Sequence, residues 1–303
     1  MRRTRNWVLA VAAAVILGGA ALVGLGMAGD GRGALPLAGT FGDSAPSPSP
    51  APTGPSPEEL RRIARAKQTK ALDAALKKYD ATVPEFSVAV YDRKTGERYA
   101  YRGAEPYETA SVVKVQVLAC LLLTAQDDDR DLTANELALA KRMIRASDND
   151  ATTALFGRLG RYRGITAANR RLGLGKTRVN SAWGLTRTTV DDQVRLLNEL
   201  VDDQGPLTAD SRQLAFELMN TVRTDQDWGV PAVARPGEEF TVKNGWLSRS
   251  TEGGRWIINS VGRVTGPDTD VSIAVLSHGH ATMDGGIGVV AKVAKLTRQH
   301  LRY

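Results

Sequence analysis

The stretch ETASVVKVQVLACLLL, from Glu108 to Leu123, places one lysine, Lys114, inside a long apolar run. A lysine rarely stays buried without partners, because its ammonium group loses its hydration. The valines favour a strand by propensity, but the apolar run is longer than a typical strand and predicts a helix buried at the centre of a domain. In such a helix Ser111 and Lys114 lie on the same face, one turn apart.

The overall composition is that of a globular protein. The chain has 303 residues, of which 42% are hydrophobic and 24% charged, enough for one or two cores. The net charge of +7 is spread along the chain with no basic stripe interleaved with aromatics, which argues against nucleic acid as a partner. The single cysteine, Cys120, excludes an internal disulfide, and the loop-like pair His278 and His280 lacks a third ligand. We therefore expect neither a metal nor a cofactor.

The N-terminal region differs from the rest. Three arginines precede an apolar stretch from Trp7 to about Met27, which predicts an exported, extracytoplasmic protein held at the membrane by a retained anchor or released from a cleaved signal peptide. The length of the stretch favours the anchor. The Gly, Ala, Ser and Pro that follow are typical of an extended tether. The predicted parts are an anchor or signal peptide at 1–29, a linker at 30–57 and a globular domain at 58–303.

The predicted elements of that domain follow a distinctive order. A helix over 58–79 precedes two short strands joined by a turn at Arg93–Gly96. Helices then fill the middle of the domain, one of them begun by a capping box of Thr133 and Glu136. Three strands begin near Glu238, Arg255 and Val271, and a helix from about Gly288 ends the chain. This order predicts an α/β fold of the α+β type, with a five-stranded, mainly antiparallel sheet, an inserted all-helical lobe and a cleft between them.

Three short motifs fall where residues of such a cleft should lie. They are Ser111-Val112-Val113-Lys114 at the start of the buried helix, Ser147-Asp148-Asn149 in the helical lobe, and Lys243-Asn244-Gly245 on the first of the late strands. One such motif alone has little weight, but their order and setting resemble the penicillin-recognising serine enzymes, which include the class A β-lactamases and the D-alanyl-D-alanine peptidases. The resemblance covers residues 58–303. A literal Lys-Thr-Gly at Lys94–Gly96 precedes the serine at a hairpin tip and is interpreted as a turn.

The first motif has a physical rationale in acyl transfer. A hydroxyl at a helix start, such as that of Ser111, lies where the helix dipole favours developing negative charge. Lys114 can remove its proton only when neutral, and both burial and a second cation, such as Lys243, lower a lysine pKa. Without the other motifs, a lysine snorkelling to the surface would be the simpler interpretation of Lys114, as a helix end with a cap would be for Ser147-Asp148-Asn149.

The resemblance implies further roles in catalysis and substrate binding. Ser147 would relay a proton to the leaving group, and Asn149 would hydrogen-bond the substrate amide. Lys243 would attract the substrate carboxylate, with Asn244 and Gly245 beside it in the binding site. The backbone N–H groups of Ser111 and Trp246 would form the oxyanion hole. Of the tryptophans in the domain, only Trp246 is expected beside the chemistry, with Trp183, Trp228 and Trp256 in the core or cleft wall.

Three departures from the family pattern concern turnover and substrate. Class A β-lactamases release the acyl group with water held by a glutamate, yet from Ala151 to Val190 the chain has no Asp or Glu. Asp191 and Asp192 follow and are typical of the first turn of a helix. Asn244 replaces the hydroxyl residue that normally helps to bind the substrate carboxylate, and the stretch between the serine motifs is short.

These features leave three interpretations open. The first is an exported serine hydrolase, monomeric and cofactor-free, that forms an acyl-enzyme on Ser111 with a β-lactam or a related D-alanyl amide. The second is a penicillin-binding D-alanyl-D-alanine peptidase that acts on peptidoglycan-type peptides. The third is a β-lactam-binding or cell-wall scaffold domain without hydrolytic activity. Fold alone does not separate them.

Overall fold

A computed structural model of the protein describes residues 54–303. The predicted anchor at 1–29, and all of the predicted linker before Gly54, therefore lie outside the described residues. Residues 54–303 form one compact unit with two hydrophobic cores. Because these residues have their own hydrophobic cores, we expect them to fold as an independent domain.

The sheet at the centre of this unit has five strands in the spatial order β2, β1, β7, β6, β5, and every neighbouring pair is antiparallel. The strands are β1 (Phe86–Asp92), β2 (Arg98–Tyr101), β5 (Glu239–Arg249), β6 (Arg255–Thr265) and β7 (Asp270–His280). The first two come from the start of the domain and the last three from its end, as the sequence predicts.

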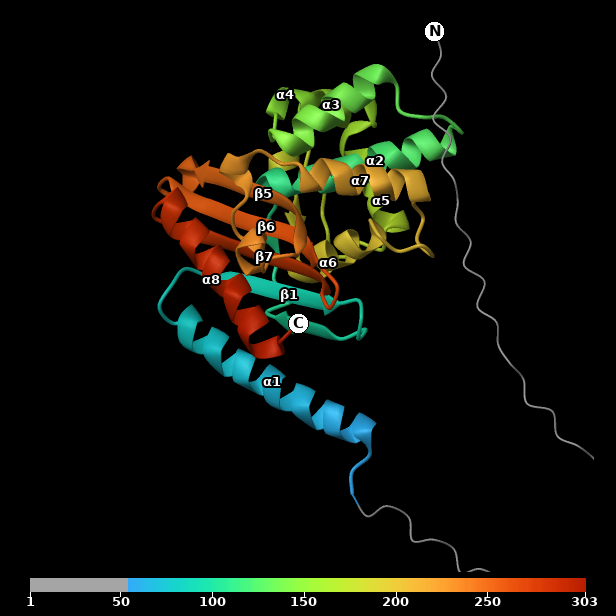
Figure 1. Cartoon of the computed structure of the whole chain (residues 1–303). Helices are drawn as coiled ribbons and strands as arrows, with labels where there is room; N and C mark the ends of the chain where they lie inside the picture. Colours follow the sequence, from blue (N-terminus) through green and yellow to red (C-terminus); the bar gives the residue numbers. More distant parts are fainter. Residues whose placement is uncertain (1–53) are drawn as a thin grey trace, which may run out of the picture. The chain divides into compact units, whose positions relative to one another are not determined.

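The two faces of the sheet pack into different cores because side chains alternate along a strand. On β7, Ile273 and Val275 lie in the core that also contains Leu72 of helix α1 (Pro57–Asp80) and Val290 of helix α8 (Met283–Leu301). Between them Ala274 points to the other core, which is shared with the helical lobe. Figure 1 shows α8 crossing the sheet, with α1 as the outermost layer on that side.

Helix α2 (Val113–Asp127) forms the centre of the helical lobe. Twelve of its fifteen residues are buried, which confirms the helix predicted for the apolar run and shows burial overriding the strand propensity of its valines. The stretch Ala110–Asp127 is long and apolar enough to cross a membrane, but 78% of it is buried within the protein. The helices around it are α3 (Ala134–Arg145), α4 (Asn149–Arg158), α5 (Arg161–Arg171), α6 (Val190–Glu199) and α7 (Ala209–Asn220).

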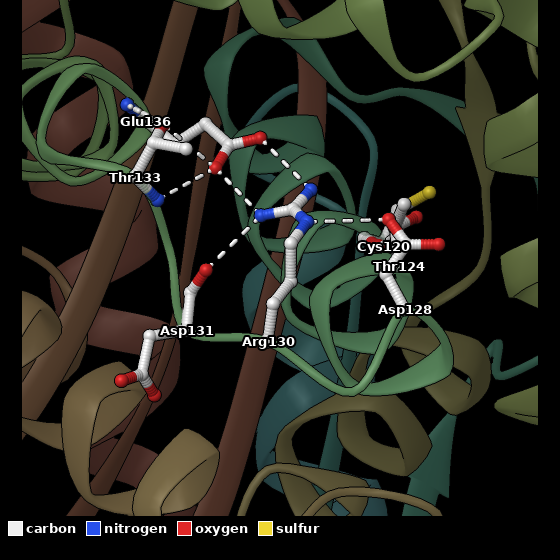
Figure 2. A network of polar contacts seen from close by, with 7 residues as sticks. All are labelled: Cys120, Thr124, Asp128, Arg130, Asp131, Thr133 and Glu136. Atoms are coloured by element: carbon white, nitrogen blue, oxygen red, sulfur yellow. Dashed lines mark hydrogen bonds and ion pairs between the residues drawn. The ribbon is translucent and has the colours of Figure 1, made fainter.

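A polar network ties the end of α2 to the start of α3 (Figure 2). The predicted capping box is present: Thr133 Oγ1 accepts from Glu136 N, and Glu136 Oε2 accepts from Thr133 N. Arg130 adds a two-pronged contact to the Glu136 carboxylate at 2.9 and 3.2 Å and a third to Asp128 at 3.2 Å. The loop that follows the buried helix is therefore held by charge-assisted hydrogen bonds.

The structure corrects two of the predicted boundaries. Helix α8 begins at Met283 and not near Gly288, because Thr282 caps it by accepting from Gly285 N. Glycine lowers helix propensity, which hid this first turn in the sequence. The predicted loop at His278 and His280 is the end of strand β7. There His280 is buried, and its burial lowers its pKa to about 4.

Candidate active site

Ser111 lies in a single 3-10 turn, η1 (Ala110–Val112), that leads directly into α2. The buried amide of Asn259 on β6 holds the preceding segment by donating to Glu108 O at 2.9 Å and Thr109 O at 3.0 Å. Ala110 has a φ of 44°, a left-handed conformation that costs energy in a residue with a Cβ. The turn that carries the serine is thus held in one strained geometry by the sheet behind it.

Gly245 lets strand β5 approach this turn closely. A Cβ at position 245 would lie 2.8 Å from Ser111 N and 2.9 Å from Val112 N, closer than real Cβ atoms come to such groups. Only glycine fits here, which explains the last residue of the third motif. The close approach also brings the next residue on the strand, Trp246, to the same cavity as Ser111.

Lys114 is completely buried, and its ammonium group is the hub of the site. Its Nζ lies 3.0 Å from Ser111 Oγ, 2.6 Å from Ser147 O, 3.0 Å from Ser147 Oγ and 2.9 Å from Asn149 Oδ1. Within residues 54–303 no carboxylate pairs with it, because the nearby Asp148 forms an ion pair with Arg142 at 2.6 Å. Burial lowers the pKa of Lys114 to about 8, against a smaller raising effect of the Asp148 charge.

A second lysine reaches the same hydroxyl from the sheet. Lys243 Nζ lies 3.0 Å from Ser147 Oγ and 2.8 Å from Asn244 O, and its side chain is also buried. Burial, and then the charge of Lys114, hold the pKa of Lys243 well below its usual value. Ser147 itself adopts a left-handed φ of 55°. Two cations that share one buried hydroxyl favour the neutral form of one of them, so the site contains an amine able to accept a proton near neutral pH.

The side chain of Asn244 does not take the place predicted for it. It is buried, and its Nδ2 donates to Gln226 O at 2.8 Å and to Trp228 O at 2.9 Å. Both amide hydrogens thus hold the segment before β5, and neither is left for a substrate carboxylate. Side-chain alternation explains this, since Lys243 and Asn244 must point to opposite faces of the strand.

A cavity of about 350 Å³ opens beside Ser111. Its wall combines the predicted residues Ser111, Asn149 and Trp246 with residues from two loops, and the full lining is Ala110, Ser111, Asn149, Ala182, Trp183, Gly184, Leu185, Trp246, Leu247 and Arg249. The side chain of Arg249 is paired with Glu108 at 3.0 Å. The contacts predicted for Asn149 and Lys243 with substrate, and for the N–H groups of Ser111 and Trp246 with an oxyanion, stay predictions.

Trp183 lies in the wall of the cavity, one of the two places predicted for it, and also close to Lys114. Its ring centroid lies 5.1 Å from Lys114 Nζ, a cation–π distance, and its Nε1 donates to Thr153 Oγ1 at 3.2 Å. The expectation that only Trp246 lies beside the chemistry is therefore wrong. The aromatic character of position 183 was visible in the sequence, but the fold of the loop that carries it was not.

The loop around Trp183 supplies no base. Within the described part of the chain, the residues that line the cavity include no Asp or Glu. Asp191 and Asp192 lie in the first turn of α6, as predicted, and Asp192 accepts from Lys176 N at 2.8 Å and Thr177 Oγ1 at 2.7 Å. Its carboxylate thus anchors the loop. Among residues 54–303 there is likewise no cluster of His, Cys, Asp or Glu suited to hold a metal ion.

The sheet, the inserted lobe and the cluster of serines and lysines together have the arrangement expected of a β-lactamase-like protein. A family model described as "Beta-lactamase enzyme family" matches residues 67–136 and 136–301, and the chain belongs to this family. No curated protein matches the chain by sequence.

Solved structures show the same fold. An ancestral class A β-lactamase has a TM-score of 0.64 and 23% identity, over 75% of this chain and 99% of that one. The chromosome-encoded β-lactamase of Vibrio parahaemolyticus has a TM-score of 0.66 and 18% identity, over 76% of this chain and 98% of that one. These similarities confirm the fold that was predicted from the sequence, which is the fold of the class A β-lactamases.

Proposed function

We propose that the protein is an exported serine enzyme that forms an acyl-enzyme on Ser111 with a β-lactam or a related D-alanyl amide and releases the acyl group slowly. One observation carries this proposal. Ser111 Oγ lies 3.0 Å from the Nζ of Lys114, a buried lysine with a pKa lowered to about 8 and no carboxylate partner among residues 54–303. Such an amine can act as the base that activates the hydroxyl.

Acylation then follows from the contacts in the cluster. Neutral Lys114 takes the proton from Ser111 as Oγ bonds to the carbonyl carbon of the substrate. The N–H groups of Ser111 and Trp246 are the proposed donors to the resulting oxyanion. As the C–N bond breaks, Ser147 gives its proton to the leaving nitrogen and regains one from Lys114, from which Ser147 Oγ is 3.0 Å distant. The lysine returns to its neutral form, and the acyl group stays on Ser111.

Release of the acyl group needs an activated water, and here the site is poorly equipped. The loop that borders the cavity presents the indole ring of Trp183 to Lys114 and no carboxylate. An aromatic ring cannot take a proton from water. This observation favours a second candidate over a fast β-lactamase, namely a penicillin-binding D-alanyl peptidase or a protein that remains acylated and so acts as a binder.

Intact-mass spectrometry tests the acylation. Residues 54–303 are incubated with a β-lactam, and we expect a mass increase of one β-lactam per chain. Ser111→Ala should abolish the increase. Ser248→Ala is the matched control, because Ser248 is exposed on the same strand β5 and donates only to Gly254 O in its turn. If the native protein gains no mass, or if Ser111→Ala still gains it, the proposed nucleophile is wrong.

A further inference from the structure

Helix α1 turns one face toward the domain and leaves the other uncovered. Leu72 and Leu76 are fully buried against the body of the domain, whereas Leu60 and Ile63 are each 54% exposed. These are two of the three large apolar side chains that are exposed among residues 54–303. Figure 1 shows the first half of α1 running along the outside of the molecule.

The outward face of α1 carries only apolar and basic side chains. At 100° per residue, six exposed residues lie within about 40° of the direction opposite Leu72 and Leu76. These six residues, here called the outer face, are Leu60, Ile63, Lys67, Lys70, Ala74 and Lys78. Within the described residues, none of the three lysines forms an ion pair or a hydrogen bond through its ammonium group.

Two acidic residues of α1 point away from the outer face and toward the domain. Asp73 accepts from Tyr99 Oη at 2.7 Å, and Asp80 accepts from Tyr101 Oη at 3.1 Å, so both carboxylates face strand β2. On the side that faces the domain, Arg65 pairs with Glu97 at 2.9 Å. Only Glu59 lies at the rim of the outer face. The helix therefore presents unneutralised positive charge beside exposed apolar side chains.

We infer that the outer face of α1 docks on an anionic lipid bilayer. A helix with lysines around apolar side chains lies in the interface of a membrane, with its apolar groups in the headgroup region and its cations on anionic lipids. A purely electrostatic partner, such as a soluble polyanion, would account for the lysines but not for the exposure of Leu60 and Ile63. The bilayer accounts for both.

The position of α1 after the predicted membrane segment is consistent with a bilayer as the partner of the outer face. The apolar stretch ends at about Met27, and α1 begins at Pro57. At about 3.3–3.6 Å per residue, the residues between these two points can reach no further than roughly 100 Å. If the apolar stretch stays in the membrane, as the sequence predicts, the tether holds α1 at a high local concentration near the bilayer, where a weak surface contact suffices.

Vesicle sedimentation of residues 54–303, which lack the predicted anchor, tests this contact. We expect binding to vesicles of phosphatidylcholine with about 30% phosphatidylglycerol, loss of binding on vesicles of phosphatidylcholine alone, and weakening by salt. The double variant Lys67→Gln/Lys70→Gln should bind at least tenfold more weakly, because each lysine near an anionic surface contributes about fivefold. Leu60→Ser/Ile63→Ser should also weaken binding.

The matched control is Lys141→Gln/Lys176→Gln, which removes the same charge from exposed positions outside α1. Equal weakening by both double lysine variants would show a response to net charge and overturn the inference. So would binding to soluble polyglutamate without binding to the anionic vesicles, or an absence of any vesicle binding by the native protein. A thermal melt of each variant checks that it is folded, and the exposure of these side chains predicts unchanged melting.

Discussion

The two walls of the active-site cavity differ in what they can do chemically. One wall, formed by η1, the start of α4 and strand β5, carries Ser111. Behind this wall, contacts of 3.0 Å link Ser111 to the buried Lys114, Lys114 to Ser147, and Ser147 to the buried Lys243. The other wall, formed by the loop around Trp183, offers an indole ring and backbone. Acylation needs only the first wall, whereas hydrolysis of the acyl group also needs a base for water. Under the proposed function, the first wall therefore serves acylation, and the second lacks the base that hydrolysis needs.

The largest expected effect comes from removing the base of the first wall. Lys114→Met keeps the volume of the side chain but has no proton acceptor, so we expect acylation by a β-lactam to slow by roughly 10²–10⁴-fold. The rate of mass increase measures this. Stability should rise, because a buried cation without a carboxylate is costly. Lys141→Met is the control, because Lys141 is an exposed residue of α3. An unchanged acylation rate in Lys114→Met would show that Lys114 is not the base.

The pH dependence of acylation sharpens the same point. Because Lys114 acts in its neutral form and has a pKa of about 8, the acylation rate should rise about tenfold per pH unit up to pH 8 and then level off. The profile is obtained by measuring the rate of the mass increase at several pH values between pH 6 and pH 9. A rate that is flat over this range would contradict the assignment of Lys114 as the base.

Stability should follow the same titration with a defined sign. The pKa of Lys114 is lower in the folded chain, about 8, than its usual 10.5 in the unfolded chain. The cost of burying its charge, about 3 kcal/mol, is therefore fully present below pH 8 and is relieved as pH rises from 8 to 10.5. Urea unfolding should show the stability advantage of Lys114→Met shrinking over that window.

Changing the second wall should shorten the lifetime of the acyl-enzyme. Trp183→Glu places a carboxylate beside Lys114, where it can serve as a base for water, and we expect the adduct to be lost at least tenfold faster. The same carboxylate raises the pKa of Lys114, so acylation at neutral pH should slow. Trp183→Gln is the matched control because it opens the same space without a base. If the adduct is lost equally fast in both variants, and faster than in the native protein, then the ring blocks water and the missing base does not limit hydrolysis.

A smaller effect is expected from the contact that joins β5 to the serine turn. Gly245→Ala forces a Cβ into the 2.8 Å space beside Ser111 N, so the turn and strand must separate. We expect a loss of about 1–3 kcal/mol in stability, typical of overpacking, and slower acylation because the Trp246 N–H moves away from the oxyanion. Gly253→Ala is the control, since no atom lies within 4 Å of its added Cβ, although its φ of 67° adds local strain. Acylation that slows equally in the two variants would disprove the proposed geometry.

The sequence was sufficient for the parts of the site that are encoded locally. The spacing of Ser111 and Lys114 and the continuous burial of α2 follow from helix periodicity. The order of strands and helices was enough to predict the sheet and the inserted lobe. The family pattern predicts that Ser147 and Lys243 lie in the same site, and in the structure Lys243 Nζ is 3.0 Å from Ser147 Oγ.

Features set by distant parts of the chain could not be predicted. Asn244 had to face either the cavity or the segment at Trp228, and only the packing of β5 against that segment decides which. Trp183 is 69 positions after Lys114, so its contact depends on the path of a loop with little regular structure. The early start of α8 was hidden because glycines at its first turn have poor helix propensity.

The central claim, acylation without efficient hydrolysis, is tested most directly by the stoichiometry of a single time course. Residues 54–303 are mixed with an excess of a chromogenic β-lactam, and ring opening is followed by absorbance while the adduct is followed by mass. We predict a burst of about one ring opened per chain, then a much slower phase during which the adduct on Ser111 persists. Continued opening of many rings at the initial rate, without accumulation of an adduct, would contradict the account.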